Sequence, residues 1–254
     1  MTKPSTMKSS RLGRAAVFLA GMLLSLSAFA SEGGALLQSG TDLDDKASLQ
    51  RGAQSFMNYC AGCHSLKYMR YSRISEDLGL SEDQVMKNLN FSGAKFGEKI
   101  VSPMPAAHAE KWFGKAPPDL SVTARVRGSD WIYTYLKSFY IDESRPLGWN
   151  NKLFPNASMP NPLWEMQGVQ RAVYGKKDAK TGEAAVERFD IAQAGTQNAE
   201  EFDRTARDIS AFLEYVGEPG AMKRQQTGVW VMLFLVFFTL MAWLLKQEYW
   251  RDVH

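Results

Sequence analysis

Both cysteines of the chain lie in one short motif. Residues 60–64 read Cys-Ala-Gly-Cys-His, which places two thiols and the imidazole of His64 close together in the chain. Cysteines at this spacing occur in thioredoxin-like redox pairs, in zinc sites and where a c-type haem is covalently attached. A redox pair follows a strand and makes no use of an adjacent histidine, whereas the residues before Cys60 have helical periodicity. The motif therefore does not favour a redox pair.

A zinc ion requires further ligands at matching spacing. The other histidines are His108 and His254, and the chain has no second pair of cysteines. The motif is instead typical of haem c attachment, in which Cys60 and Cys63 bond to the two vinyl groups and His64 binds the iron as proximal ligand. We therefore predict one covalently attached haem c.

The opposite face of the iron needs a second ligand. In the body of the chain only His108 offers another imidazole, and methionine is the usual alternative, which raises the reduction potential. Two of the 12 methionines lie in loops braced by proline: Met104 in SPMPAAHA and Met159 in FPNASMPNPLW. Proline restricts the backbone and so stiffens a loop that must hold a weak ligand. The local residues give Met159 only a modest preference over Met104.

Two helices are expected to position the motif. The first ends near Cys60, where Leu49, Ala53 and Phe56 share one helical face. Gly52 and Phe56 precede Cys60 by eight and four residues, which resembles the N-terminal helix of the cytochrome c fold, where a glycine and an aromatic residue cross a C-terminal helix. That second helix is predicted over residues 203–217. Its apolar stripe is Ile209, Phe212, Leu213 and Val216, and its stop signal is Gly217 with Pro219.

The segment over residues 114–140 predicts two more helices. Asp119 or Ser121 is expected to cap the first. Ser129 and Asp130 are expected to begin the second, whose large side chains are Trp131, Tyr135, Leu136 and Phe139. Arg125 and Arg127 are candidates to pair with a haem propionate, and they are equally typical of exposed surface arginines. Farther on, residues 169–191 have alternating apolar residues around Lys-Thr-Gly-Glu, which predicts a β-hairpin.

The N-terminus is typical of a secretory signal. Four cationic residues precede an apolar run that ends in Ala28-Phe29-Ala30, a small-x-small cleavage pattern. We predict a signal peptide over residues 1–30, cut after Ala30. The alternative is a retained N-terminal anchor, but the apolar run is short and no stop-transfer pattern follows.

The C-terminus is typical of a membrane anchor. Residues 228–245 contain no charge, and as a helix they would extend about 27 Å, close to the hydrocarbon thickness of a bilayer. Tryptophan and tyrosine near both ends suit the membrane interface. We predict an exported domain over residues 31–222, a transmembrane helix over residues 227–246 and a cytoplasmic tail over residues 247–254. A buried core helix is the alternative, and it would rarely be apolar on every face.

The charge balance does not indicate nucleic acid. The whole chain carries 30 Lys and Arg against 27 Asp and Glu, a net charge of +3. Four of those cations lie in the predicted signal peptide, and without them the balance is 26 against 27. A mature chain with a net charge of −1 gives no basic surface for a nucleic acid partner.

Several motifs occur in an order that is typical of one family. They are CAGCH at 60–64, APPDLSVTARVRGSDWIYTYL at 116–136, NPLW at 161–164 after NASMP, ARDISAFLEYVGEP at 206–219, and the C-terminal apolar helix. From about residue 47 onward the chain resembles the cytochrome c1 family, the haem subunit of the cytochrome bc1 complex, in its proteobacterial form. The resemblance implies that Met159, not Met104, is the axial ligand. It also implies that Arg125 faces a haem propionate and that Pro117, Pro118 and Leu120 line the haem edge. No role is assigned to residues 87–115.

The resemblance also implies a fold and a function. The fold would be mainly α, a cytochrome c-like haem domain with insertions that include the small β-hairpin, plus one C-terminal transmembrane helix. The chain would not be an enzyme on its own. It would sit in the bacterial inner membrane with its haem domain in the periplasm. There it would relay electrons from a Rieske iron–sulfur protein to a c-type cytochrome, within a dimeric bc1 complex that contains cytochrome b.

Two other functions remain open from the residues. One is a membrane-anchored haem peroxidase or oxidase subunit, which requires a sixth iron position that substrate can enter. The other is a membrane-tethered cytochrome c that serves a terminal oxidase, which the PPDLS block disfavours.

Overall fold

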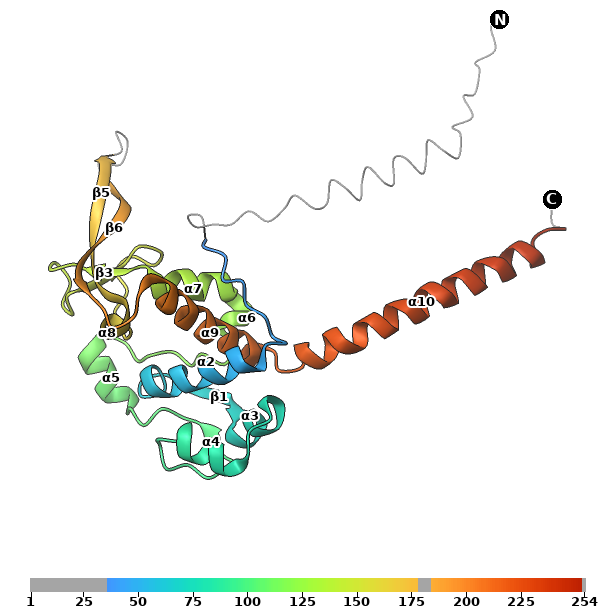
Figure 1. Ribbon diagram of the computed structural model, residues 1–254, viewed down its shortest axis with the longest axis horizontal. Coiled ribbons are helices and arrows are strands. Elements are labelled where there is room, and N and C mark those ends of the chain that lie inside the picture. Colours follow the sequence, from blue (N-terminus) through green and yellow to red (C-terminus); the bar gives the residue numbers. More distant parts are fainter. Residues whose placement is uncertain (1–35, 178–183, 253–254) are drawn as a thin grey trace, which may run out of the picture. The chain divides into compact units, whose positions relative to one another are not determined.

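The computed structural model describes residues 36–177 and 184–252, so the predicted signal peptide and the predicted hairpin turn lie outside the described residues. The helices are α2 (Lys46–Tyr59), α3 (Tyr71–Leu78), α4 (Glu82–Asn88), α5 (Ala106–Phe113), α6 (Thr123–Arg127), α7 (Ser129–Lys137), α8 (Trp164–Gln167), α9 (Ala199–Gly217) and α10 (Ala221–Tyr249). The strands are β1 (Leu66–Arg70), β2 (Lys99–Ile100), β3 (Phe139–Ile141), β4 (Trp149–Asn151), β5 (Gly168–Lys177) and β6 (Ala184–Ala194). Helices predominate (Figure 1), which confirms the predicted fold class.

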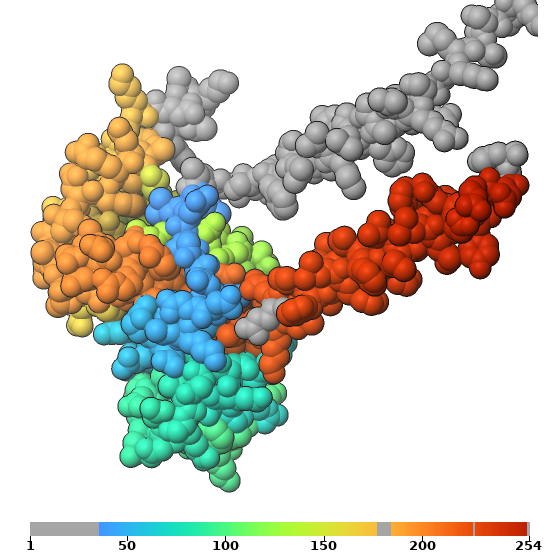
Figure 2. Space-filling model, turned by 45° about the vertical axis from the view of Figure 1, so that its right-hand side comes forward, coloured from blue at the N-terminus to red at the C-terminus, as the bar shows by residue number. Residues whose placement is uncertain are grey.

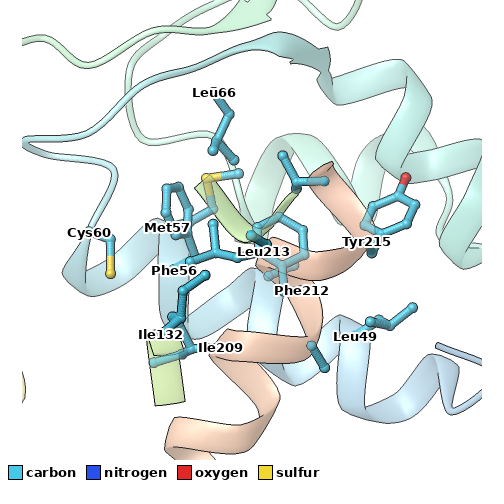
Figure 3. Close-up of a cluster of buried hydrophobic side chains, with 14 of the residues drawn as sticks. Leu49, Phe56, Met57, Cys60, Leu66, Ile132, Ile209, Phe212, Leu213 and Tyr215 are labelled. Carbon is cyan, nitrogen blue, oxygen red and sulfur yellow. The ribbon is translucent and has the colours of Figure 1, made fainter. Parts of the chain in front are cut away.

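The core is built where α2 and α9 pack together. α2 buries one face that includes Leu49, Ala53 and Phe56. The stripe predicted for α9, from Ile209 to Val216, is buried as well. The rings of Phe56 and Phe212 lie 5.6 Å apart between centroids, and Figure 3 shows them inside one cluster with Leu213 and Ile132. Both predicted apolar stripes are therefore confirmed, and the stripe on α2 packs against the stripe on α9.

Gly52 lies at the closest approach of these two helices. A Cβ atom at this position would be 2.0 Å from the Asp208 carbonyl oxygen and 2.8 Å from Cβ of Phe212. The carboxylate of Asp208, which is buried, accepts hydrogen bonds at 2.6 Å from both Ser48 Oγ and Arg51 Nε. Glycine at position 52 of α2 therefore allows the short distance between α2 and α9. The buried carboxylate of Asp208 on α9 fixes how the two helices are aligned.

The predicted β-hairpin exists, and it belongs to a larger sheet than the sequence predicted. β5 pairs antiparallel with β6 from Gly168 opposite Ala194 to Lys177 opposite Ala184. β3 joins β5 in parallel and β4 in antiparallel pairing, so the strand order is β4-β3-β5-β6. The short β3 and β4 carry no clear alternation of apolar residues, and only the tertiary fold brings them to the hairpin.

The predicted helix beginning at Ser129 is confirmed as α7, but it stops before Phe139. Trp131, Tyr135 and Leu136 lie on α7, whereas Phe139 begins β3. The hydroxyl of Ser138 donates to the Thr134 carbonyl at 2.5 Å, and this bond closes the last turn. The side chains expected on one helical face are therefore divided between a helix and a strand.

A short N-terminal segment, residues 37–41, lies across α7 and α9 (Figure 2). Its backbone NH groups at Leu37 and Ser39 donate to Thr134 Oγ1 (2.9 Å) and Asp130 Oδ1 (2.7 Å) of α7. The hydroxyl of Thr41 donates to Glu214 Oε2 of α9 at 2.6 Å. This segment ties the two helices together through polar side chains, a feature that apolar periodicity does not reveal.

The C-terminal helix α10 contains the predicted transmembrane segment and extends beyond it at both ends. It has 29 residues, and it is the one helix in the described part of the chain that is long and apolar enough to cross a membrane. None of its most apolar 18-residue stretch is buried in the protein. The alternative of a buried core helix is therefore wrong, and the membrane crossing itself stays a prediction.

The contact at Gly52 makes a first prediction about stability. Gly52→Ala should destabilise the domain by about 1–3 kcal/mol, because the added methyl group meets backbone atoms that cannot rotate away. Thermal unfolding of the purified full-length protein, followed by circular dichroism, measures the loss. Gly97→Ala is the matched control, since a Cβ atom there has nothing within 4 Å. Equal unfolding temperatures for the two variants would contradict this role of Gly52.

Candidate functional site

The Cys-x-x-C-H motif forms a tight turn directly after α2. The backbone NH of Cys60 donates to the Phe56 carbonyl at 2.8 Å, which prolongs the helix by one residue. The NH groups of Cys63 and His64 then donate to the Cys60 carbonyl at 3.0 and 2.8 Å. Figure 3 shows Cys60 at the edge of the core cluster that holds Phe56. The buried end of α2 therefore fixes both thiols and the imidazole on one turn.

The two thiols have the wrong properties for a redox pair. They are not joined in a disulfide. Burial raises the pKa of Cys60 to about 12, and the neighbouring Cys63 adds to this shift. Burial also raises the pKa of Cys63. A nucleophilic cysteine of a redox pair has a lowered pKa, so these thiols do not fit that chemistry.

A zinc site is not supported either. Over residues 36–177 and 184–252, no group of three or more His, Cys, Asp or Glu side chains could hold a metal ion. His108 is exposed on α5, where its ring lies 5.6 Å from that of Trp112. It has therefore not joined the cysteine motif as a further ligand.

The ring of His64 is oriented by a backbone carbonyl. His64 is buried, and its Nδ1 lies 2.8 Å from the carbonyl oxygen of Pro118. A carbonyl only accepts hydrogen bonds, so Nδ1 carries the proton and Nε2 keeps its lone pair for a metal. Burial lowers the pKa of His64, against smaller opposing effects of the Pro118 hydrogen bond and the Asp119 charge. The imidazole is therefore held neutral, the form in which histidine binds metals.

The Pro-Pro-Asp-Leu-Ser loop is bonded to the chain that follows the motif. The NH of Leu120 donates to the Ser65 carbonyl at 2.9 Å. The NH of Lys67 donates to Asp119 Oδ2 at 2.9 Å, and the NH of Tyr68 donates to Ser121 Oγ at 3.1 Å. Residues 64–68 and 118–121 are thus joined step by step, so the carbonyl that orients His64 has a fixed position.

These bonds overturn the predicted helix caps. α6 begins at Thr123 without a side-chain cap, so neither Asp119 nor Ser121 caps it. Burial acts to raise the pKa of Asp119, but hydrogen bonds from Ser121 and Lys67 outweigh it and leave the pKa below its ordinary value. Asp119 and Ser121 accept from backbone NH groups that lie 52 and 53 residues away in sequence, a partnership that local spacing does not show.

Of the residues expected to line a haem edge, two lie directly beside the motif. Pro118 supplies the carbonyl to His64, and Leu120 packs against the core cluster. Pro117 is partly buried next to them. Their contact with a haem edge stays a prediction.

Part of the segment to which no role was assigned supports the motif from another direction. The hydroxyl of Ser102 donates to the Gly62 carbonyl at 2.7 Å, and the NH of Ser102 donates to Ser65 Oγ at 2.9 Å. Just before it, β2 pairs with β1. The backbone between the two cysteines is therefore held in place by Ser102, which nothing in the local sequence distinguishes from an ordinary loop serine.

The loop that carries Met159 is fixed onto the end of α7 by two buried asparagines. Asn151 donates from Nδ2 to the Tyr135 carbonyl at 2.8 Å and accepts at Oδ1 from the NH groups of Leu153 and Phe154. At the other end, Asn161 donates to Gln167 Oε1 at 2.8 Å. Gln167 in turn donates to the carbonyl of Lys137 at 3.2 Å. The loop is therefore anchored on two carbonyl groups in the last turn of α7, those of Tyr135 and Lys137.

In the loop between Asn151 and Asn161, Met159 contacts a tyrosine of α7. The hydroxyl of Tyr135 lies 3.7 Å from Met159 Sδ and donates to it. The tyrosine ring stacks on Trp131, with centroids 5.0 Å apart and planes 9° apart, and meets Phe139 edge-on. Burial raises the pKa of Tyr135 to about 12. Met159 as an iron ligand stays a prediction, as does the exclusion of Met104, whose NH donates to Ser102 Oγ.

The two candidate arginines have different partners. The guanidinium of Arg125, which is 60% exposed, pairs with Glu218 just after α9. Glu218 also pairs with Arg224 in the first turn of α10. The guanidinium of Arg127 lies over the ring of Trp131, 5.2 Å from its centroid. The predicted contact of Arg125 with a propionate is not tested by these pairs and stays a prediction.

Known proteins resemble this chain over most of its length. It is 48% identical to "Cytochrome c1" of Allochromatium vinosum, over 92% of this chain and 96% of that protein. It is 44% identical to "Ammonia monooxygenase gamma subunit" of Nitrosomonas europaea, over 84% of this chain and 86% of that protein. It is 30% identical to "Cytochrome c1" of Rhodospirillum rubrum, over 94% of this chain and 97% of that protein. The family model described as Cytochrome C1 family matches residues 40–253. The chain belongs to the cytochrome c1 family.

Proposed function

We propose that this chain is a membrane-anchored c-type cytochrome that relays single electrons within a quinol–cytochrome c oxidoreductase, the bc1 complex. The observation that carries the proposal is the setting of His64. Its imidazole lies on the same turn as the two thiols, with Nδ1 bonded to Pro118 and Nε2 left for iron. Membership of the cytochrome c1 family supports the same conclusion.

The residues of the motif fit a covalently attached haem. Cys60 and Cys63 would hold haem c through two thioether bonds, and His64 would bind the iron. When bound, haem c supplies an iron centre that takes up and releases one electron at a time. The chain contributes a neutral imidazole in a fixed orientation and a buried helix end that keeps the motif in place. Arg125 and the edge residues Pro117, Pro118 and Leu120 are proposed to contact the haem periphery.

Met159 is proposed as the second axial ligand. Its loop is anchored at both ends to α7, so the sulfur has little freedom to leave the iron. Two protein ligands would leave no position on the iron for substrate. The chain would then transfer electrons without making or breaking bonds, and it would not be an enzyme on its own.

The partners follow from this role. A Rieske iron–sulfur protein would deliver the electron, and a c-type cytochrome would collect it. Cytochrome b would hold the quinol chemistry in a dimeric complex. The haem domain, residues 31–222, would lie in the periplasm. α10 would cross the inner membrane, and residues 247–254 would be cytoplasmic.

A second candidate function comes from the name of the Nitrosomonas relative. A monooxygenase subunit that acted directly on oxygen would need an iron position open to a small molecule. This chain would then bind carbon monoxide readily at its ferrous haem, whereas an iron closed by His64 and Met159 would not. Ligand binding at the iron therefore separates an electron relay from an oxygen-activating enzyme.

The ligand assignment gives the second prediction. Met159→Leu should keep the covalent haem, lower its reduction potential and allow carbon monoxide to bind the ferrous form, because a thioether favours ferrous iron and closes the site. Potentiometric titration and carbon monoxide difference spectra of isolated membranes measure these effects. Turnover from quinol to cytochrome c should collapse as well.

Met104→Leu is the control and should change none of these properties. A lowered potential in Met104→Leu with an unchanged Met159→Leu would show that the ligand is Met104. If wild-type ferrous haem already binds carbon monoxide, the relay function is wrong and the enzyme alternative gains support.

Haem attachment is the subject of the third prediction. Cys60→Ala or Cys63→Ala should leave membranes with little stably attached haem in this subunit, because each removes one thioether bond. Haem staining after denaturing electrophoresis measures attachment, and an antibody to the chain confirms its presence. A band of full intensity in the double variant would rule out this site.

The fourth prediction concerns processing and topology. The mature chain should begin at Ser31, and its C-terminus should face the cytoplasm. N-terminal sequencing and protease treatment of a C-terminally tagged protein in sealed spheroplasts test both points. An intact Met1, or a tag cleaved from outside, would contradict the proposed orientation.

A further inference from the structure

The hydroxyl of Tyr135 contacts Met159, and the packing of Tyr135 in the protein does not require this contact. The ring alone stacks on Trp131 and meets Phe139 edge-on. The hydroxyl adds a single hydrogen bond, and its acceptor is Met159 Sδ at 3.7 Å. A thioether is a weak acceptor, so such a bond adds little to folding stability. Its effect would fall on the sulfur itself.

The surrounding structure keeps the two groups together. Tyr135 lies on α7, and the carbonyl of the same residue accepts the amide of Asn151 at the start of the methionine loop. Asn151 is fully buried. One residue of α7 thus holds the loop through its backbone and meets the sulfur through its side chain. Movement of the ring that carried the hydroxyl away from Met159 would break the stacking on Trp131.

We propose that Tyr135 is a positioning residue for Met159, whose hydroxyl donates a hydrogen bond to the thioether sulfur and thereby raises the reduction potential of the haem. The proposal rests on the proposed function, in which Met159 is an iron ligand.

The physical basis is the electron density on sulfur. A thioether sulfur has two lone pairs, so one can bind iron while the other accepts the Tyr135 hydroxyl. The hydrogen bond withdraws electron density from sulfur, which weakens its donation to ferric iron more than to ferrous iron. Hydrogen bonds to the ligands of a metal are one of the means by which proteins tune its potential.

Tyr135→Phe in the full-length protein tests the proposal, because it removes the hydroxyl and keeps the ring. We expect covalent haem and methionine ligation to persist, while the potential falls. The ratio of ferric to ferrous haem at a given applied potential should rise by up to tenfold, which for a one-electron couple is about 59 mV. The near-infrared charge-transfer band of ferric methionine ligation should shift without disappearing.

Tyr133→Phe is the matched control. Its hydroxyl lies on the same helix, donates to Asp203 and accepts a hydrogen bond from Lys137 at 2.9 Å. Loss of this hydroxyl should lower the unfolding temperature and leave the potential and the near-infrared band unchanged. A general loosening of α7 would instead lower the potential in both variants, and that result would overturn the proposal.

Met159→Leu, measured in parallel, separates the two levels of the inference. If Met159→Leu abolishes the near-infrared band while Tyr135→Phe changes neither band nor potential, the role of Tyr135 is wrong and the ligand assignment stands. If Met159→Leu leaves the band intact, Met159 is not the ligand and the role of Tyr135 fails with it. A shifted band and lowered potential in Tyr135→Phe alone, beside a lost band in Met159→Leu, supports both.

Discussion

The close approach of α2 and α9 at Gly52 is the constraint on which the other features depend. Any side chain at this position would overlap the backbone of α9 near Asp208. With the helices in contact, Phe56 reaches Phe212, and the core closes around the last turn of α2. The cysteine motif begins at the residue where that helix ends. The position of the chemical site is therefore a consequence of helix packing.

Around this fixed turn, the site is built mainly from hydrogen bonds to loops. Pro118 orients the imidazole of His64 through its carbonyl, and Asp119 and Ser121 hold the same loop against the backbone after the motif. Ser102 reaches the motif from a third segment. Loops are stiff only when their polar groups are satisfied, and here the partners of one loop lie mostly in another. This rigidity would suit the proposed electron transfer, because the protein would reorganise little when the charge on a bound iron changed.

α7 is the helix on which the loop that carries Met159 is anchored. Its first two turns are held by residues 37–41 through Asp130 and Thr134. Its last carbonyls accept side-chain amides from Asn151 and Gln167, and its Tyr135 hydroxyl reaches Met159. The carbonyl groups in the last turn of a helix are accessible to side-chain donors. The methionine loop uses the carbonyls of Tyr135 and Lys137 as its anchors, so the end of α7 holds a proposed ligand in place.

The sequence alone determined the parts of this protein whose signals are local. The motif at residues 60–64 has all its reactive side chains within five positions, and the apolar stripes on α2 and α9 repeat at helical spacing. The uncharged apolar run in α10 is recognised by its length. Local signals also predicted the β5–β6 hairpin and the start of α7. The tertiary structure alone decided the pairings between polar atoms far apart in the chain: His64 with Pro118, Ser102 with Gly62, and Arg125 with Glu218. Asp119 and Ser121 looked like helix caps because short polar side chains serve either a nearby or a distant NH group equally well. Which NH group they meet depends on how the loops are brought together, and no periodicity in the sequence records that.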